Sequence, residues 1–99
     1  MGTLDIRLSE KAINWFKDEM LLTAGDYVRF FARYGGSSPI QQGFSLGISN
    51  EEPVNPIVTK ESEGIQFFIE EKDLWYFDDH HLIVHYDEDL NEPQYKYEK

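Results

Sequence analysis

Apolar and polar residues alternate along much of this chain and predict most of its strands. Leu4, Ile6 and Leu8 fall on one side of an extended segment over residues 3–8, with charged residues between them. Later segments show the same strand character, rich in β-branched and aromatic residues. The predicted later strands cover residues 27–34, 44–49, 57–60, 65–70, 82–86 and 93–98.

A different period marks one long helix over residues 10–22. Ile13 and Phe16 recur at helical spacing on one apolar face, and Ser9 is a residue type that commonly caps a helix N-terminus. A second, shorter helical segment is predicted over residues 71–77. The pattern therefore combines many strands with one long and one short helix.

The length of 99 residues indicates a single domain over residues 1–99. The predicted elements give a mainly β, α+β fold: a two-layer β-sandwich or pseudo-barrel with one long N-terminal helix and one short helix. A chain of this size buries roughly 60–65% of the surface that its unfolded form exposes. Association into a homodimer would add to so modest a core.

The charge and the absent cysteines exclude several classes of partner and cofactor. A net charge of −10 disfavours nucleic acid and anionic membranes, both of which need a basic surface. No apolar leader and no run of ~20 apolar residues is present, so we expect a cytoplasmic protein without a membrane anchor. With no cysteine, the chain has neither disulfides nor thiolate ligands.

One loop in the predicted β region offers two kinds of chemistry. The sequence Gly35-Gly36-Ser37-Ser38 could hold an anion through its backbone amides, or Ser37 or Ser38 could act as a nucleophile with a histidine as base. The loop lacks the lysine and spacing of a P-loop. A structural turn is the interpretation that the sequence favours.

A histidine-rich segment near the C-terminus is a candidate metal site. His80, His81 and His85 lie among acidic residues that include Asp79, and imidazole with carboxylate suits zinc, iron or nickel. The alternative, which we favour, is a solvated acidic loop with surface histidines, because adjacent side chains in a turn diverge.

An aromatic pair in the short helix is a candidate partner surface. Leu74 and Phe77 already supply an inward face, which leaves Trp75 and Tyr76 to face outward. Tryptophan and tyrosine are enriched in the energetically important parts of protein interfaces. This pair predicts a protein partner, of unknown identity, or a second subunit.

An ordered set of segments also resembles a known family. The matching segments are residues 28–30, 35–38 and 42–46, followed by residues 64–69, 74–77 and 82–84. Together they span the chain from about Leu4 to Tyr86 and are similar to the HesB-like family, the A-type proteins associated with iron–sulfur cluster assembly. The chain is identified on this basis as a short, cysteine-free member.

The departures from the family pattern decide what the resemblance implies. Ser37 stands where the family has a cysteine, and Pro39 stands where it has a glycine. Because a serine hydroxyl is a poor substitute for a soft thiolate, we expect no iron–sulfur cluster. We also expect no other cofactor and assign no catalytic residue. The first expectation is a non-catalytic binding or adaptor protein linked to iron–sulfur metabolism. The alternatives are a His/carboxylate metal-binding protein and a small serine-dependent hydrolase.

Overall fold

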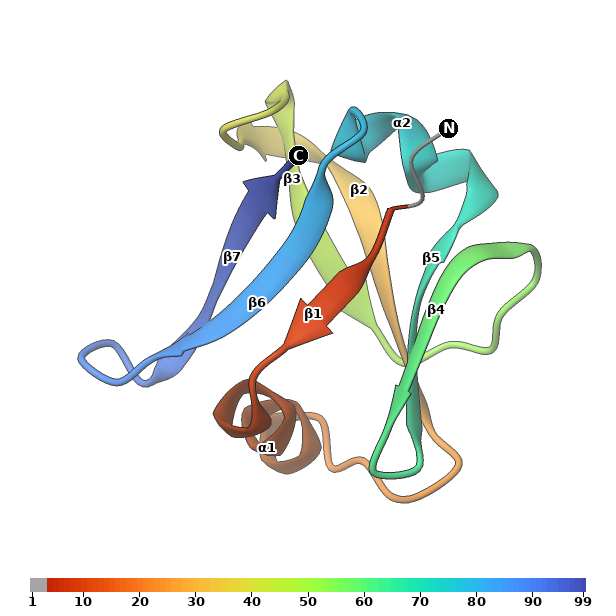
Figure 1. Cartoon of the computed structure of the whole chain (residues 1–99), viewed down its shortest axis with the longest axis vertical. Coiled ribbons are helices and arrows are strands. Elements are labelled where there is room, and N and C mark those ends of the chain that lie inside the picture. The colour runs from red at the N-terminus through yellow and green to blue at the C-terminus, as the bar shows by residue number, and fades with distance from the viewer. Residues whose placement is uncertain (1–3) are drawn as a thin grey trace.

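The strands and helices lie close to where the hydrophobic pattern predicts them. A computed structural model describes residues 4–99 and arranges them as two β-sheets with a helix at each end (Figure 1). The elements are β1 (Ile6–Leu8), α1 (Glu10–Glu19), β2 (Tyr27–Ser37), β3 (Gln42–Ser49), β4 (Pro56–Ser62), β5 (Ile65–Glu70), the 3-10 helix η1 (Glu71–Asp73), α2 (Leu74–Phe77), β6 (His81–Asp87) and β7 (Glu92–Glu98).

The smaller sheet has the order β1-β6-β7 and joins the two ends of the chain. β1 runs parallel to β6, with Ile6 opposite Leu82, whereas β7 is antiparallel to β6. The Asp5 amide donates to Nδ1 of His81 at 2.8 Å, and its carbonyl accepts from the amide of Leu82 at 2.9 Å. These bonds hold a short N-terminal strand that would be marginal alone.

The larger sheet has the order β3-β2-β5-β4, with β2 and β5 parallel. Strands β3 and β4 follow one another in the sequence but lie at opposite edges, so the segment between them must cross β2 and β5. The Glu70 carboxylate accepts from the backbone amides of Val54 and Asn55, at 3.1 and 2.9 Å, and anchors this crossing segment. Phe68 is completely buried although it does not belong to the main core cluster.

Aromatic rings fill the space between the sheets. The ring of Phe30 from β2 lies edge-on to Tyr95 from β7, with centroids 6.4 Å apart, and so joins the two layers. Phe16 of α1 packs on Phe30 and Phe67 at one end of the sandwich, with centroids 6.0 and 5.8 Å away. Each fully buried Phe contributes roughly 1.5–3 kcal/mol. Helix α1 thus closes one end of the core.

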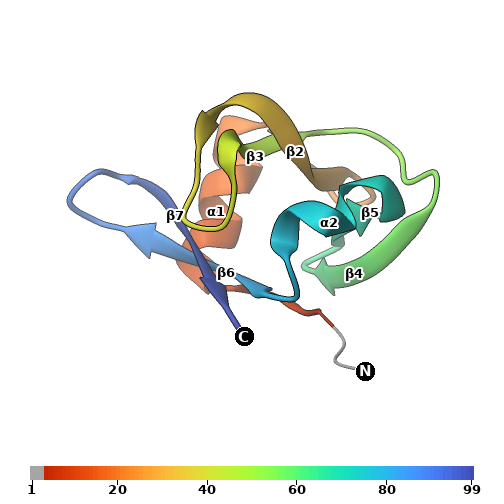
Figure 2. The ribbon, with the colours of Figure 1, turned by 90° about the horizontal axis from the view of Figure 1, so that it is seen from above.

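The second helix closes the other end. Figure 2 looks onto this end and shows α2 beside the β2–β3 hairpin and the end of β7. Tyr76 and Phe77 are buried, and the hydroxyls of Tyr76 and Tyr97 lie 3.0 Å apart in a hydrogen bond. The predicted α+β class, mainly β in two layers with an N-terminal and a short helix, is therefore confirmed. No helix in residues 4–99 has the length and apolar character needed to cross a membrane.

Helix α1 begins as predicted but ends early. The Ser9 hydroxyl accepts from the Ala12 amide at 3.2 Å, which is the expected N-cap contact. The helix was predicted to continue to residue 22 yet ends at Glu19, and Leu21 has a φ of 53°. A left-handed residue stops the helix there, well before the glycine at position 25.

Strand β2 continues through the paired glycines. Gly35 and Gly36 have φ values of 110° and 70° and make a bulge in the ladder between Tyr34 and Ser37. Glycine is the residue that adopts these angles without steric cost. The predicted end of the strand at residue 34 was therefore too early, and the turn follows it. At the N-terminus, β1 is shorter than the predicted strand, whose first residue lies outside the described residues.

Candidate functional site

The Gly-Gly-Ser-Ser segment forms the bulge and the start of a tight turn. The hydroxyl of Ser38 accepts from the amide of Gln41 at 3.1 Å, and the Ser38 amide donates to the Gln41 carbonyl at 2.9 Å. Ser37 pairs with Gln42 in the ladder between β2 and β3. Within residues 4–99, no hydrogen bond joins either serine to a histidine. The Ser38 hydroxyl closes the turn, and its hydrogen bonds within residues 4–99 go to the Gln41 backbone and not to a side-chain base.

The candidate metal ligands are separated in the fold. Nδ1 of His80 lies within hydrogen-bond distance of backbone carbonyls at the end of α2, and Nδ1 of His81 accepts from the amide of Asp5. His85 is exposed on β6, and Asp79 has a φ of 62° in the turn. In the described part of the chain, no three His, Asp or Glu side chains come together to hold a metal ion. The metal-binding alternative is therefore not supported by the described residues.

The predicted Trp75 and Tyr76 pair is divided between surface and core. Trp75 is 49% exposed, whereas Tyr76 is completely buried and bonds to Tyr97. The prediction that Tyr76 faces outward was wrong, because Phe77 and Tyr76 together, rather than Leu74 and Phe77, form the buried side of α2. Only Trp75 of the pair remains available to a partner.

Trp75 belongs to a row of rings that we call the aromatic patch: Tyr34, Phe44 and Trp75. Tyr34 lies edge-on to Phe44 with centroids 5.6 Å apart, and Phe44 lies edge-on to Trp75 at 5.0 Å. Tyr34 and Phe44 are paired across β2 and β3 on the sheet face that carries the core. Tyr34 is nevertheless 87% exposed, because this end of the face extends past the buried core.

Tyr34 and Phe44 of the aromatic patch lie within an uncharged segment of the sequence. Residues 34–50 contain no Asp, Glu, Lys, Arg or His, although 28% of the whole chain is charged. Nε2 of Gln41, in the turn, lies 3.4 Å from the carbonyls of both Trp75 and Tyr76. The turn of the β2–β3 hairpin is thus tied to α2.

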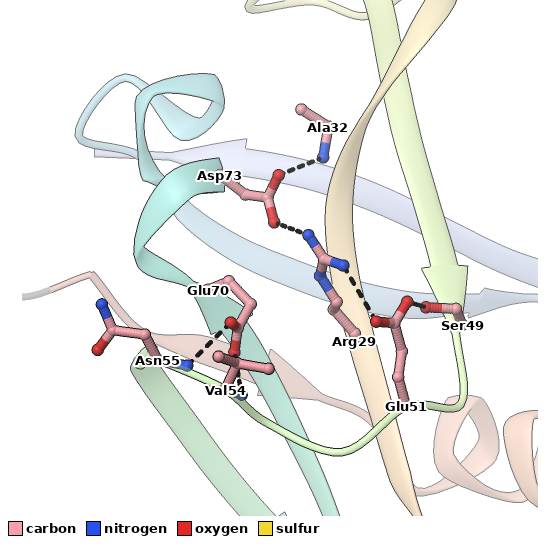
Figure 3. Close-up of polar contacts among 8 residues, drawn as sticks. All are labelled: Arg29, Ala32, Ser49, Glu51, Val54, Asn55, Glu70 and Asp73. Atoms are coloured by element: carbon pink, nitrogen blue, oxygen red, sulfur yellow. Dashed lines mark hydrogen bonds and ion pairs between the residues drawn. The ribbon is translucent and has the colours of Figure 1, made fainter.

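A buried charge network lies on the opposite, outer face of the larger sheet (Figure 3). Arg29 donates to Asp73 at 2.6 Å and to Glu51 at 3.2 Å, and Asp73 also accepts from the Ala32 amide. Burial lowers the pKa of Arg29, but the hydrogen bonds and charges of Asp73 and Glu51 outweigh it and leave the pKa above its usual value. The guanidinium lies 5.2 Å from the ring centroid of Phe31.

This network connects three separate elements of the fold. Arg29 comes from β2, Asp73 from η1, and Glu51 from the crossing segment, where Ser49 hydrogen-bonds its second carboxylate oxygen. The Ser49 bond is the main cause of the lowered pKa of Glu51, with Arg29 adding to it. The arrangement fixes η1 and the crossing segment on the sheet.

Two adjoining shallow grooves run between α1 and the β6–β7 hairpin. They measure about 610 and 390 Å³ and share Lys11, Asn14 and Tyr86 in their lining. An exposed ion pair between Lys11 and Glu88, 2.6 Å long, connects the two elements beside them. The hydrogen bond and charge of Glu88 raise the pKa of Lys11. The larger groove is also lined by Ser9, Glu10 and His85, but within residues 4–99 no hydrogen bond joins the Ser9 hydroxyl, which caps α1, to either of the other two side chains.

Comparison with known proteins identifies the relatives of this chain. A Bacillus subtilis protein named pyruvate dehydrogenase inhibitor is 53% identical over 95 residues, which cover 96% of this chain and 100% of that protein. An uncharacterized protein of Staphylococcus saprophyticus is 40% identical over 95 residues, covering 93% of this chain and 97% of its own length. A third, from Staphylococcus aureus, is 40% identical over 84 residues, covering 82% and 86%. No family model matches the chain, and no solved structure matches it.

This chain belongs to the family of the Bacillus subtilis pyruvate dehydrogenase inhibitor. Assignment to the HesB-like family was therefore wrong, and so were the link to iron–sulfur metabolism and the adaptor function drawn from it. The resemblance rested on a common order of strand, helix and strand around a glycine pair. In this family member the pair is a bulge within β2 that serves the hairpin.

Sequence reasoning missed most of the residues that define the candidate surface. Tyr34 and Phe44 were treated as ordinary strand residues, because an alternating pattern does not tell how far the opposing layer extends. The uncharged run over residues 34–50 was a usable signal. The contact between Arg29 and Asp73 was not predictable from spacing, since the two residues are 44 positions apart in this relative of the Bacillus protein.

Proposed function

We propose that this chain inhibits pyruvate dehydrogenase by binding to it. The supporting observation is 53% identity, over the full length of the relative, to a protein named pyruvate dehydrogenase inhibitor. Identity at this level preserves the fold and much of the surface, and the surface is where such a function resides. The cytoplasmic location expected from the sequence is compatible with this proposal.

The surface of the chain favours inhibition by contact and not by chemistry. The interior between the sheets is filled with aromatic and aliphatic side chains, and the grooves beside α1 are shallow. In residues 4–99 the candidate serines and histidines do not come together. An inhibitor of this kind would block a site on its target or hold the target in an inactive arrangement.

The proposal is tested by adding the purified chain to the pyruvate dehydrogenase complex purified from the organism that produces the chain. Formation of NADH from pyruvate, coenzyme A and NAD is followed at increasing concentrations of the chain. We expect the rate to fall to a saturating minimum and the chain to co-elute with the complex in size-exclusion chromatography. The reactions of the separate components, assayed one at a time, then identify the component that is inhibited.

Two controls make the result specific. A 2-oxoglutarate dehydrogenase complex, which carries out related chemistry, should keep its rate at the same concentrations of the chain. A heat-unfolded sample should not inhibit, since the proposed surface requires the fold. An unchanged pyruvate dehydrogenase rate at large molar excess, together with no co-elution, would contradict the proposed function.

A further inference from the structure

We propose that the aromatic patch, with the hairpin turn beside it, is the surface that docks on pyruvate dehydrogenase. The inference rests on the proposed function and adds the location and chemistry of the contact. The occupant is an uncharged, apolar hollow on the enzyme with basic residues around its rim. Three independent features of the described residues support this assignment.

The first feature is the exposure of rings that would normally be covered. Tyr34 and Trp75 are 87% and 49% exposed, yet both contact Phe44 edge-to-face. The other exposed large apolar residues of the described chain, such as Val54 and Leu90, are aliphatic, and single exposed residues of this kind are ordinary in proteins. Contiguous Tyr and Trp side chains form the central anchors of many interfaces.

The second feature is the distribution of charge. The run over residues 34–50 is uncharged in a chain with 19 acidic and nine basic residues. The core of an interface is depleted of charged residues, because each must lose its hydration on binding. Outside the run, Asp78 and Asp79 follow α2 directly, and the Asp78 amide donates to the Trp75 carbonyl. Exposed Arg33 and Lys72 also lie close to the patch in the sequence, but the chain as a whole carries a net charge of −10. An uncharged centre on so acidic a protein is complementary to an apolar hollow with a basic rim.

The third feature is that the surface is held in place before any partner arrives. The turn is closed by Ser38 and Gln41, and the Gln41 side chain reaches α2 at the carbonyls of Trp75 and Tyr76. Tyr76 is held in turn by the hydrogen bond between its hydroxyl and that of Tyr97. A rigid surface has less conformational entropy to lose on binding, which favours affinity.

The test compares exposed apolar residues inside and outside the aromatic patch. Tyr34→Ser and, separately, Trp75→Ala are compared with Leu90→Ser, which removes an exposed side chain at the β6–β7 hairpin. Affinity for the purified complex is measured by surface plasmon resonance, and circular dichroism with urea unfolding checks that each variant is folded. We expect Tyr34→Ser and Trp75→Ala each to weaken binding by at least about tenfold, the usual loss at an interface anchor. Leu90→Ser should bind as the parent does.

The rim is tested separately with the variant carrying both Asp78→Asn and Asp79→Asn. Both aspartates have positive φ, and asparagine tolerates that conformation, so the turn should be preserved. We expect slower association with the complex and a weaker dependence of the association rate on salt. If this variant associates with the complex at the same rate and with the same salt dependence as the parent chain, the proposed basic rim on the enzyme is overturned.

The outcomes separate this inference from the proposed function. If the parent chain neither binds nor inhibits, the proposed function fails and the docking surface fails with it. If the parent binds and inhibits while Tyr34→Ser and Trp75→Ala are unchanged, the function stands and the docking surface is overturned. It is also overturned if Leu90→Ser loses as much affinity, or if Tyr34→Ser only converts a dimer of the chain to a monomer.

Discussion

The guanidinium of Arg29 and the carboxylate of Asp73 meet at 2.6 Å where both side chains are shielded from water, with 13% and 8% of their side-chain surface exposed. Such a pair is stable only while both partners are present, because an isolated buried charge loses its hydration without compensation. Nε of Arg29 has no hydrogen-bond partner within residues 4–99, so the guanidinium depends on its two carboxylates.

Removing the Asp73 carboxylate should therefore be strongly destabilising. We expect Asp73→Ala to lower the free energy of unfolding by about 3–5 kcal/mol, measured by urea denaturation, because it leaves Arg29 without its buried partner. Glu51→Gln is the matched control, since Glu51 bonds the same guanidinium but is 47% exposed. That change should cost less than about 1 kcal/mol. Equal losses for the two variants would contradict the importance of burial.

The hydroxyls of Tyr76 and Tyr97 should show non-additive effects on stability. Tyr97→Phe leaves the buried Tyr76 hydroxyl without its partner and should cost about 1–3 kcal/mol. Replacing both tyrosines by phenylalanine removes both polar groups and should cost less than the sum of the single changes. Urea denaturation of the two single variants and the double variant measures the coupling. Additive losses would mean that the bond contributes nothing.

Two tyrosines of β7, Tyr95 and Tyr97, should make the stability of the fold sensitive to alkaline pH. Burial raises the pKa of Tyr95 to about 12, and burial together with the Tyr76 bond raises the pKa of Tyr97 as well. Because the folded values lie above the unfolded value of about 10, this stability is complete below pH ~10 and is lost as pH rises beyond it. We expect a loss of less than about 1.4 kcal/mol per pH unit for each hydroxyl, since partial contact with water screens both.

Urea denaturation at several pH values between about 8 and 11 measures this slope against the unfolded tyrosine pKa of about 10. In Tyr97→Phe the slope should be smaller, with Tyr95 supplying what remains. A free energy of unfolding that stays constant across this range in the parent chain would contradict the prediction.

Gly47 should tolerate no side chain while Phe31 is opposite it. A Cβ atom at Gly47 would lie 2.5 Å from the nearest atom of the Phe31 ring, far inside van der Waals contact. Gly47→Ala should therefore cost about 1–3 kcal/mol by overpacking, measured by thermal and urea denaturation. In the background of Phe31→Ala the same change should cost much less, because the obstacle is gone. If Gly47→Ala lowers the free energy of unfolding equally in the Phe31→Ala background, the Phe31 ring is not the cause of the strain.

The sequence was sufficient to predict which helices and strands form, but not where each of them ends. Period and capping predicted β5 over residues 65–70 and the start of α1 at Ser9, because those signals are local. The end of α1 depended on Leu21 in a left-handed conformation, which a non-glycine residue rarely signals. Which sheet face remains open beyond the core depends on the opposing layer, so the exposure of Tyr34 required the fold.

The candidate chemistry failed for a related reason. His81 has a structural role, accepting from the Asp5 amide, and the histidines on either side of it have different surroundings. These residues are close together in the sequence, but the turn after α2 and the strand β6 separate them in space. The family resemblance failed because element order is shared by many unrelated small domains.

The parallel pairing of β1 with β6 has a consequence for biosynthesis. Asp5 and His81 hydrogen-bond across 76 positions of sequence, so the partner of β1 is made long after β1 itself. Contacts this distant in sequence form slowly, because a long loop must close before they stabilise anything. Until β6 emerges, Ile6 and the apolar face of α1 have no smaller sheet to pack on. The smaller sheet therefore forms only after β6 has been synthesised.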